Sequence, residues 1–449
     1  KPYLLRSSDR GRSWTSIAGD LPDRDTVYSI QQDHVNADLL FAGTEFGVYF
    51  TLDGGEKWIK LKGGMPTIAV RDIAIQRREN DLVLGTFGRS FYILDDYSPL
   101  RHATKENLAK NTIFPIKDAL RYIQRGSGRG SQGASFYSAS NPPFGAVFTY
   151  YVKDKLQTLK ERRKEAEKKG SSKYPTVDEM RAEDQEQAPA IMLVVRDESG
   201  AVVRRIAGSR SKGVHRTAWD LRYPASTPAR IGGSTTTRFR RRGGGSGPLA
   251  LPGTYTVELV KVVEGKTETL AEPVSFNVIP LELATFAAKD REAVLEFQKK
   301  VARLQRAVSG ATRVAGEAQT RLQYVRAAIN ETLAADPALL HEAFEMEGRL
   351  RKLVTKLSGD RTLSRLQAPV PQSINQRISS VVGSQWNVTN PPTQTQRNQY
   401  LHAGTEFTEI LAALRKLIEE DLVGLEKKLE AAGAPWTPGR IPEWKMEDD

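Results

Sequence analysis

The sequence predicts a multidomain chain with β-propeller blades first, an antiparallel β-sandwich in the middle and a C-terminal α-helical coiled coil or bundle. Three observations predict this fold class. A four-strand pattern returns after about 44 residues within 1–101. Short strands alternate with turns over 141–281, and a heptad pattern of apolar residues follows residue 285. The 449 residues exceed what one hydrophobic core usually holds, which also favours several domains.

Residues 1–101 are expected to hold the last blades of a partial β-propeller. Short apolar runs separated by Gly, Asp and Asn turns predict strands, and after the fourth run the pattern starts again. A four-stranded repeat of about 40 to 45 residues is typical of a propeller blade. The first runs are Val27–Ile30, Leu39–Ala42, Gly47–Phe50 and Lys57–Lys60, and their echoes are Val70–Ile75, Leu82–Thr86 and Ser90–Leu94.

The middle of the chain is expected to be a linker followed by a β-sandwich. Residues 102–140 lack periodicity and include the Gly/Ser-rich stretch 125–133, which is typical of a flexible linker. Short strands and turns then run over 141–281, from Ala146–Val152 to Ser275–Val278. The charged segment 153–188 interrupts them with a near balance of basic and acidic residues. We expect this insertion to be an exposed helix plus a loop.

The last third, 285–449, is expected to be an antiparallel coiled coil or helical bundle. Asp336 and Pro337 fit the start of a second helix, a weaker helix covers 373–382, and a final one ends near Gly433. The final helix has apolar residues from Tyr400 to Leu429, with a slip in their spacing at Ile418. The first seam consists of Val294, Phe297, Val301, Leu304, Val308, Ala311, Ala315, Ala318, Leu322, Val325 and Ile329.

A short motif with the pattern Ser/Thr-x-Asp-x-Gly-x-x-Trp occurs twice, as SSDRGRSW and TLDGGEKW. The Asp accepts hydrogen bonds from amides further along a tight turn, and Ser or Thr supports it. The Gly allows a positive φ, and the Trp begins the next strand and buries its ring between blades. We interpret the motif as a structural hairpin clamp, with calcium binding by Asp9 or Asp53 as the alternative. Its residues are Ser7, Asp9, Gly11 and Trp14, and Thr51, Asp53, Gly55 and Trp58.

The two motifs resemble Asp-boxes, the bacterial-neuraminidase (BNR) repeats of sialidases and sortilin-type propellers. The order of propeller, sandwich and helices resembles the C-terminal portion of large secreted bacterial proteins that are described as glycosyl hydrolase-like. The resemblance implies that the motif lies on hairpins away from an active-site face, and that the chain is secreted, periplasmic or at the cell surface. The stretches 195–204, 219–222 and 252–255 look like an immunoglobulin-like (Ig-like) domain.

No catalytic residue is assigned. A sialidase-type site needs an arginine cluster, a Tyr/Glu pair and an acid from several blades, and this chain holds too few blades to assemble them. Arg71, Asp72, Glu45 and Tyr49 are candidates to face a propeller axis, but the sequence gives none of them a partner. The absence of cysteine excludes thiolate chemistry, and the five histidines lack metal-site spacing. We therefore expect no metal and no cofactor.

The net charge of +12 permits acidic partners. Arg238, Arg240, Arg241 and Arg242 lie beside Phe239 in a Gly-rich loop, and form a candidate anion-binding site. The simpler interpretation is a solvated loop between strands. Nucleic acid therefore ranks behind a protein or a glycan as the expected partner.

Three functional hypotheses remain. The leading one is a non-catalytic binding or scaffolding portion of a secreted propeller protein that recognises a protein or glycan, with assembly through the C-terminal helices. The second is a glycosidase whose active site lies in blades upstream of a fragment, since Lys1 opens within an apparent strand. The third is nucleic-acid binding through the arginine loop. No apolar run of about 18 residues occurs, so no membrane span is expected.

Overall fold

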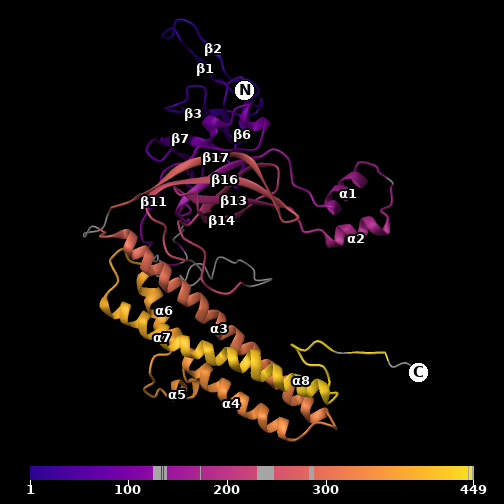
Figure 1. Cartoon of the computed structure of the whole chain (residues 1–449). Coiled ribbons are helices and arrows are strands. Elements are labelled where there is room, and N and C mark those ends of the chain that lie inside the picture. The colour runs from indigo at the N-terminus through magenta and orange to yellow at the C-terminus, as the bar shows by residue number, and fades with distance from the viewer. Residues whose placement is uncertain are drawn as a thin grey trace. The chain divides into compact units, whose positions relative to one another are not determined.

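The structure is a computed structural model, and it describes residues 1–124, 133, 135, 139–171, 173–229, 247–282, 288–442 and 444–446. The chain divides into two compact units. The first consists of Lys1–Arg121, Gly130–Asp220 and Pro252–Ile279, and the second of Tyr122–Arg129, Leu221–Leu251 and Pro280–Asp449. The first unit is β-rich and the second is largely helical (Figure 1).

The N-terminal part of the first unit contains three antiparallel sheets. A hairpin of two strands is followed by a four-stranded and a three-stranded meander. Within the described residues these sheets do not close into a propeller ring. Their strands are β1 (Leu5–Arg6) and β2 (Thr15–Ser16); β3 (Val27–Gln32), β4 (Leu40–Thr44), β5 (Gly47–Thr51) and β6 (Trp58–Lys60); and β7 (Val70–Gln76), β8 (Asp81–Thr86) and β9 (Phe91–Leu94).

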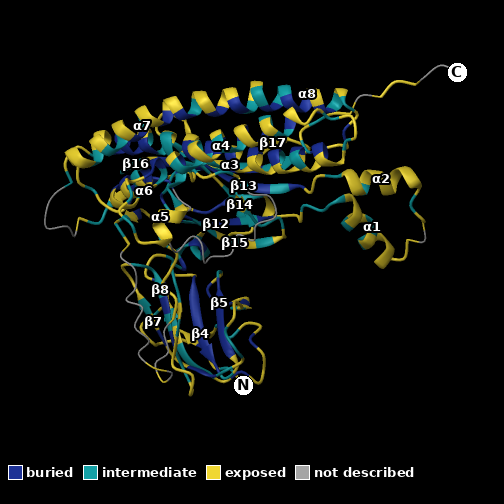
Figure 2. Cartoon of the chain, turned by 90° about the horizontal axis from the view of Figure 1, so that it is seen from below, coloured by how far each residue is buried: buried dark blue, intermediate teal, exposed yellow. Residues whose placement is uncertain are grey.

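The two meanders repeat the same register. Val27 pairs with Thr44 and Val70 with Thr86, and both ladders shift register directly after that pair. Gly43 lets the sheets approach, because a Cβ there would lie 2.8 Å from the carbonyl oxygen of Val70. Strands β4 and β5 are buried throughout, as the dark blue in Figure 2 shows. The cores of these sheets are formed by Leu39, Phe41, Val48, Phe50, Val70, Ile73, Leu82, Leu84 and Tyr97, and by Leu4, Leu21, Leu40, Ala42, Tyr49 and Trp58.

The segment that was expected to be a linker contains two short strands. β10 (Thr112–Ile113) pairs with β12, and β11 (Ala119–Arg121) lies at the edge of the five-stranded sheet. Strands of two or three residues leave no readable alternation in a sequence, which is why the linker prediction over 102–140 extends too far. The Gly/Ser-rich stretch 125–132 lies outside the described residues.

Two antiparallel sheets pack together in the middle of the chain, with strand orders β10-β12-β15 and β11-β17-β16-β13-β14. An aromatic cluster joins them, since the rings of Phe148 and Phe276 are 5.4 Å apart and those of Trp219 and Tyr255 are 5.2 Å apart. Trp219 is fully buried at this centre. The long strands are β12 (Ala146–Val152), β13 (Ala190–Asp197), β14 (Val202–Gly208), β15 (Gly213–Trp219), β16 (Gly253–Val263) and β17 (Lys266–Pro280).

The charged insertion forms two helices rather than one helix and a loop. α1 (Leu159–Lys168) and α2 (Val177–Gln185) each begin with a capping box, in which Thr158 bonds with Glu161 and Thr176 with Glu179. Arg163 of α1 makes an ion pair with Glu183 of α2, at 2.6 Å. The insertion is thus a helical hairpin that is held by charge rather than by a core, because neither helix has a buried residue.

The second unit is built around one long helix, α3, whose predicted seam is mostly buried. Its core is shared with the neighbouring helices, and the buried stripes of α3, α7 and α8 are visible in Figure 2. The slip near Ile418 corresponds to a π-helical segment at 416–422, which rotates the apolar stripe. No helix of the described part is long and apolar enough to span a lipid bilayer. The helices are α3 (Arg291–Glu331), α4 (Ala338–Ser358), α5 (Arg361–Arg365), α6 (Ile374–Gln385), α7 (Gln394–Arg415) and α8 (Val423–Ala431).

Candidate functional site

The second clamp, Thr51–Trp58, forms the turn between β5 and β6. Thr51 Oγ1 donates to Asp53 Oδ1 at 2.7 Å and accepts from the backbone N–H of Gly55 at 3.0 Å. Asp53 Oδ1 also accepts from the backbone N–H of Lys57 at 3.0 Å. Burial acts to raise the pKa of Asp53, but hydrogen bonds from Thr51 and the backbone outweigh it and the pKa is lowered. These polar groups therefore hold the turn.

The first clamp, Ser7–Trp14, repeats this arrangement between β1 and β2. Ser7 Oγ donates to Asp9 Oδ1 at 2.9 Å and accepts from the backbone N–H of Gly11 at 2.6 Å. Ser13 donates to Asp9 through its backbone N–H at 2.9 Å and its hydroxyl at 2.7 Å. These bonds from Ser13 lower the pKa of Asp9 to about 2. The described residues contain no cluster of three or more His, Asp or Glu that could hold a metal ion.

The two tryptophans differ, and one expectation needs correction. Trp58 is 6% exposed, whereas Trp14 is 60% exposed. The expectation of a buried ring therefore holds for Trp58 and is wrong for Trp14. The physical reason is that the segment after β2 covers Trp58, whereas no described segment covers Trp14 in the same way.

A group of chemically distinctive residues gathers where β3 and β7 begin. We call Tyr28, Glu45, Arg71, Asp72 and Phe87 the β3–β7 cluster. Tyr28 and Arg71 occupy the same position of the two repeats, because each follows the valine that opens its strand. Glu45 and Phe87 are likewise equivalent, since each follows the threonine that ends β4 or β8. The repeat thus brings unlike side chains to one end of two adjacent sheets.

The centre of this cluster is a cation held on aromatic faces. The guanidinium carbon of Arg71 lies 3.9 Å from the ring centroid of Tyr28 and 5.3 Å from that of Phe87. The hydroxyl of Tyr28 donates a hydrogen bond to Glu45 Oε2. This bond raises the pKa of Tyr28 above its ordinary value. Among the described residues, Arg71 has no carboxylate oxygen within 4.0 Å.

Two of the candidates for a propeller axis, Asp72 and Tyr49, make contacts within the fold. Asp72 Oδ1 accepts from the hydroxyl of Ser29 at 3.3 Å and from the backbone N–H of Ile73 at 2.9 Å. Tyr49 is buried and does not join the cluster. Burial, followed by a hydrogen bond to Asp25, raises the pKa of Tyr49 to about 12. Sequence reasoning missed Tyr28 and Phe87, which an alignment of the two repeats would have placed beside Arg71 and Glu45.

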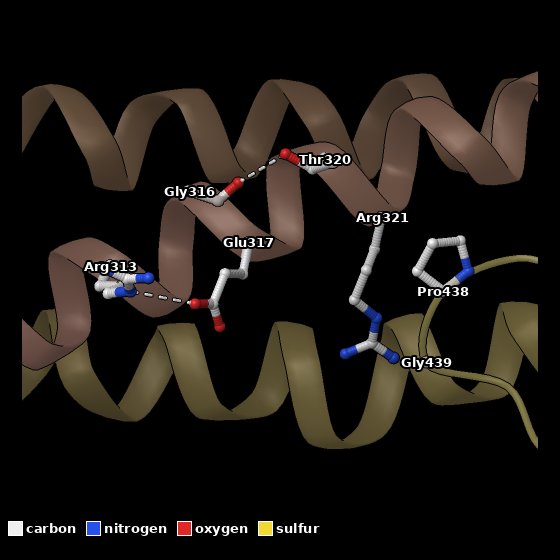
Figure 3. Close-up of a pocket in the computed structure, with 7 residues that line it drawn as sticks. All are labelled: Arg313, Gly316, Glu317, Thr320, Arg321, Pro438 and Gly439. Carbon is white, nitrogen blue, oxygen red and sulfur yellow. Dashed lines mark hydrogen bonds and ion pairs between the residues drawn. The ribbon is translucent and has the colours of Figure 1, made fainter. Parts of the chain in front are cut away.

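The helical unit has a shallow pocket of about 520 Å³, but its charges are compensated. Figure 3 shows the Arg313–Glu317 ion pair on its rim, with a distance of 3.3 Å. Arg321 pairs with Glu426 of α8 at 2.6 Å. A Cβ on Gly439 would lie 2.6 Å from Arg321 Nε, so the C-terminal loop packs directly on that guanidinium. The pocket is therefore a packing site of the helices and the C-terminal loop.

The candidate anion-binding residues Arg238, Arg240, Arg241 and Arg242 lie outside the described residues. The structure therefore does not test the prediction that these arginines bind an anion. The β3–β7 cluster is the candidate site that the geometry itself brings together.

Comparisons with known proteins found no matching family model and no matching curated protein. Among solved structures, the extracellular domain of a putative one-component system of B. thetaiotaomicron is 11% identical, with a TM-score of 0.17, 62% of this chain covered and 28% of that chain. PorZ, a surface component of the type-IX secretion system of Porphyromonas gingivalis, is 14% identical, with a TM-score of 0.15, 57% of this chain covered and 30% of that chain. This chain thus spans less than a third of either neighbour, and TM-scores this low bear on neither function nor site residues.

Proposed function

We propose that the chain is a non-catalytic binding or scaffolding portion of a secreted or cell-surface protein, and that the β3–β7 cluster binds a carboxylate of a protein or an acidic glycan. The observation that carries the proposal is the exposed guanidinium of Arg71, which lies against two aromatic rings. Its charge is exposed at the ends of two sheets and supported by two aromatic rings.

The chemistry of the cluster suits a ligand that is acidic on one side and apolar on another. A guanidinium offers a planar fork of donors that matches a carboxylate. Phe87, which is 68% exposed, presents a flat apolar face beside that fork, and sugar rings and apolar side chains both pack on such faces. Phe46 is also exposed and directly follows Glu45. The proposal thus narrows the expected partner from any protein or glycan to one that carries a negative group.

Loss of the Arg71 charge should weaken binding strongly. A hydrogen bond to a charged group contributes about 1.5 to 3 kcal/mol, so Arg71→Gln should lower the affinity for the ligand roughly 10- to 100-fold. The measurement is titration calorimetry with oligosaccharides that carry uronate or sialate groups and with acidic peptides, each against its neutral counterpart.

The matched control is Arg77→Gln, which removes an exposed arginine just after the other end of β7. It should leave the affinity unchanged, and the melting temperature of both variants should equal that of the parent. Equal binding of acidic and neutral ligands, or equal loss in the two variants, would contradict the proposal.

One observation favours a glycosidase as the second candidate. The pair Tyr28 and Glu45, with Arg71 beside it, provides the residue types that a sialidase-type reaction needs, in which a tyrosine acts as nucleophile. Turnover of a chromogenic sialoside that is abolished by Tyr28→Phe would support this candidate and replace the binding proposal.

A further inference from the structure

The helical unit has a polar hollow of about 730 Å³ where α4 ends, α5 lies and α6 begins. These three helices follow one another along the chain (Figure 1). Ligand pockets of proteins usually have volumes of about 300 to 1,000 Å³, so the hollow is large enough for a small molecule. The polar side chains that line it include those of Ser358, Arg361, Ser364, Arg365, Gln367 and Gln376.

Two arginines of this lining have no counter-charge. Arg361 and Arg365 are four residues apart on α5, so they lie about one turn apart on the same side of it. Among the described residues, neither guanidinium has a carboxylate oxygen within 4.0 Å. The only carboxylate among the described lining residues belongs to Asp360, whose Oδ1 accepts from the backbone N–H groups of Thr362 at 2.8 Å and of Leu363 at 3.1 Å. Like charges at this spacing repel each other, and a bound anion would relieve that repulsion.

The chain around the hollow carries a surplus of positive charge. Residues 348–405 contain eight arginines and lysines but a single acidic residue, Asp360. Within the described part of the chain, only Arg349 of these eight forms an ion pair with a carboxylate, that of Asp421 at 2.7 Å. Lys352 and Lys356 are exposed on one side of the last two turns of α4, which ends at the hollow. The hollow thus lies in a positive region that the described residues leave uncompensated.

We infer that this hollow binds a ligand with two or more adjacent phosphate groups. A phosphate ester carries about 1.5 to 2 negative charges at pH 7 and several strong acceptor oxygens, and a guanidinium offers it a planar fork of donors. Arg361 and Arg365 supply two such forks from positions about 6 Å apart along the helix axis, which suits neighbouring phosphates better than one carboxylate. The hydroxyl of Ser364 and the side-chain amides of Gln367 and Gln376 can donate to the remaining oxygens.

This phosphate site is independent of the function proposed above. It lies in the helical unit, whereas the β3–β7 cluster belongs to the β-rich unit. It also differs from the pocket beside Arg321, whose charge is compensated by Glu426. A failure of carboxylate binding at Arg71 would therefore leave the phosphate site untouched, and the two sites can be tested separately.

Titration calorimetry with tripolyphosphate and orthophosphate at one fixed ionic strength tests the inference. Tripolyphosphate should bind at least about tenfold more tightly, because it engages both arginines. Arg361→Gln and Arg365→Gln should each lower its affinity roughly 10- to 100-fold. The control is Lys427→Gln, which removes an exposed cation near the other end of α4, where Lys428 pairs with Glu342 at 2.8 Å. It should leave the affinity unchanged, and all three variants should melt at the temperature of the parent.

Phenylglyoxal modification of arginine, mapped by mass spectrometry, gives a second measurement that needs no substitution. Tripolyphosphate should slow the modification of Arg361 and Arg365 several-fold and leave that of the exposed Arg415 on α7 unchanged.

Vesicles of phosphatidylcholine with and without phosphatidic acid distinguish the source of the phosphate. Retention on the vesicles with phosphatidic acid that tripolyphosphate displaces would support the site and identify a lipid headgroup. Binding of tripolyphosphate without retention would support the site and identify a soluble phosphate. No binding of tripolyphosphate, equal affinities for tripolyphosphate and orthophosphate, equal losses in Arg361→Gln and Lys427→Gln, or no protection of Arg361 and Arg365 would overturn the inference.

Discussion

The buried carboxylate of Asp33 should be a strong determinant of the stability of the first unit. It lies after β3 and accepts hydrogen bonds from Arg101 Nε at 2.8 Å, from the hydroxyl of Tyr97 at 2.6 Å and from the backbone N–H of Asn36 at 2.8 Å. Its side chain is 0% exposed and that of Arg101 is 13% exposed. This network joins the first meander to the segment that follows the second, so its loss should loosen both.

The cost of Asp33→Ala follows from what the substitution leaves behind. A buried guanidinium would lose its counter-charge, and the hydroxyl of Tyr97 would lose its acceptor. Breaking a buried pair in this way costs about 3 to 5 kcal/mol. In a domain of this size, each kcal/mol lowers the melting temperature by about 2 to 4 °C. The unfolding midpoint of the β-rich unit should therefore fall by about 10 °C.

Thermal unfolding followed by near-ultraviolet circular dichroism is the assay. The exposed carboxylate of Asp178, paired with Arg181 on α2, is the control, and Asp178→Ala should change stability by less than about 1 kcal/mol. The double variant Asp33→Ala/Arg101→Met should recover part of the loss, because it removes the orphaned charge. If Asp33→Ala melts within about 2 °C of the parent, the pair contributes little and the reasoning is refuted.

Three further predictions concern acid, the clamp and the aromatic core. Burial acts to raise the pKa of Asp33, but hydrogen bonds from Arg101 and Tyr97 outweigh it and hold that pKa well below its usual range. Its contribution to stability should thus be complete above about pH 4 and be lost as the pH falls further; acid unfolding curves that are equal for the parent and Asp33→Ala would contradict this. Gly55→Ala should destabilise the chain by about 1 to 3 kcal/mol, because φ is +105° and Ile17 blocks the added Cβ. Gly11→Ala, where φ is +86° but only the Trp14 ring is near, should lower the free energy of unfolding by less, as measured in urea titrations. Equal losses at the two positions would show that backbone strain alone, and not the clash with Ile17, causes the destabilisation. Trp219→Ala should cost about 3 to 5 kcal/mol, since the ring is fully buried at the centre of the two packed sheets, and a loss below about 1 kcal/mol would show that the aromatic cluster is not the core there.

The elements that the sequence predicts well are those whose signal is local and long. The apolar residues of the α3 seam recur at a regular spacing over most of its 41 residues, and nearly all of them are buried in the structure. The spacing of the apolar residues slips at Ile418 in the sequence, and the π-helical segment at 416–422 is the structural cause of that slip. By contrast, β10 and β11 are only two and three residues long. β10 forms by pairing with β12, and β11 forms at the edge of the five-stranded sheet. Such pairing with strands far along the chain leaves no pattern in the local sequence.

The candidate site was predicted only in part, for a different reason: the sequence marked Arg71, Asp72 and Glu45 but missed Tyr28 and Phe87. The clamp positions carry the same residue types in both copies, because each copy must make the same turn, and identity between repeats therefore marks structure. At the positions that form the β3–β7 cluster the copies differ: Tyr28 stands where the next repeat has Arg71, and Glu45 where it has Phe87. Nothing in the folding of a meander needs those differences, since both meanders form the same register without sharing them. In a chain built from repeats, the positions where one copy departs from the other at an exposed strand end are thus the ones to test for binding, and Arg71 is the first of them.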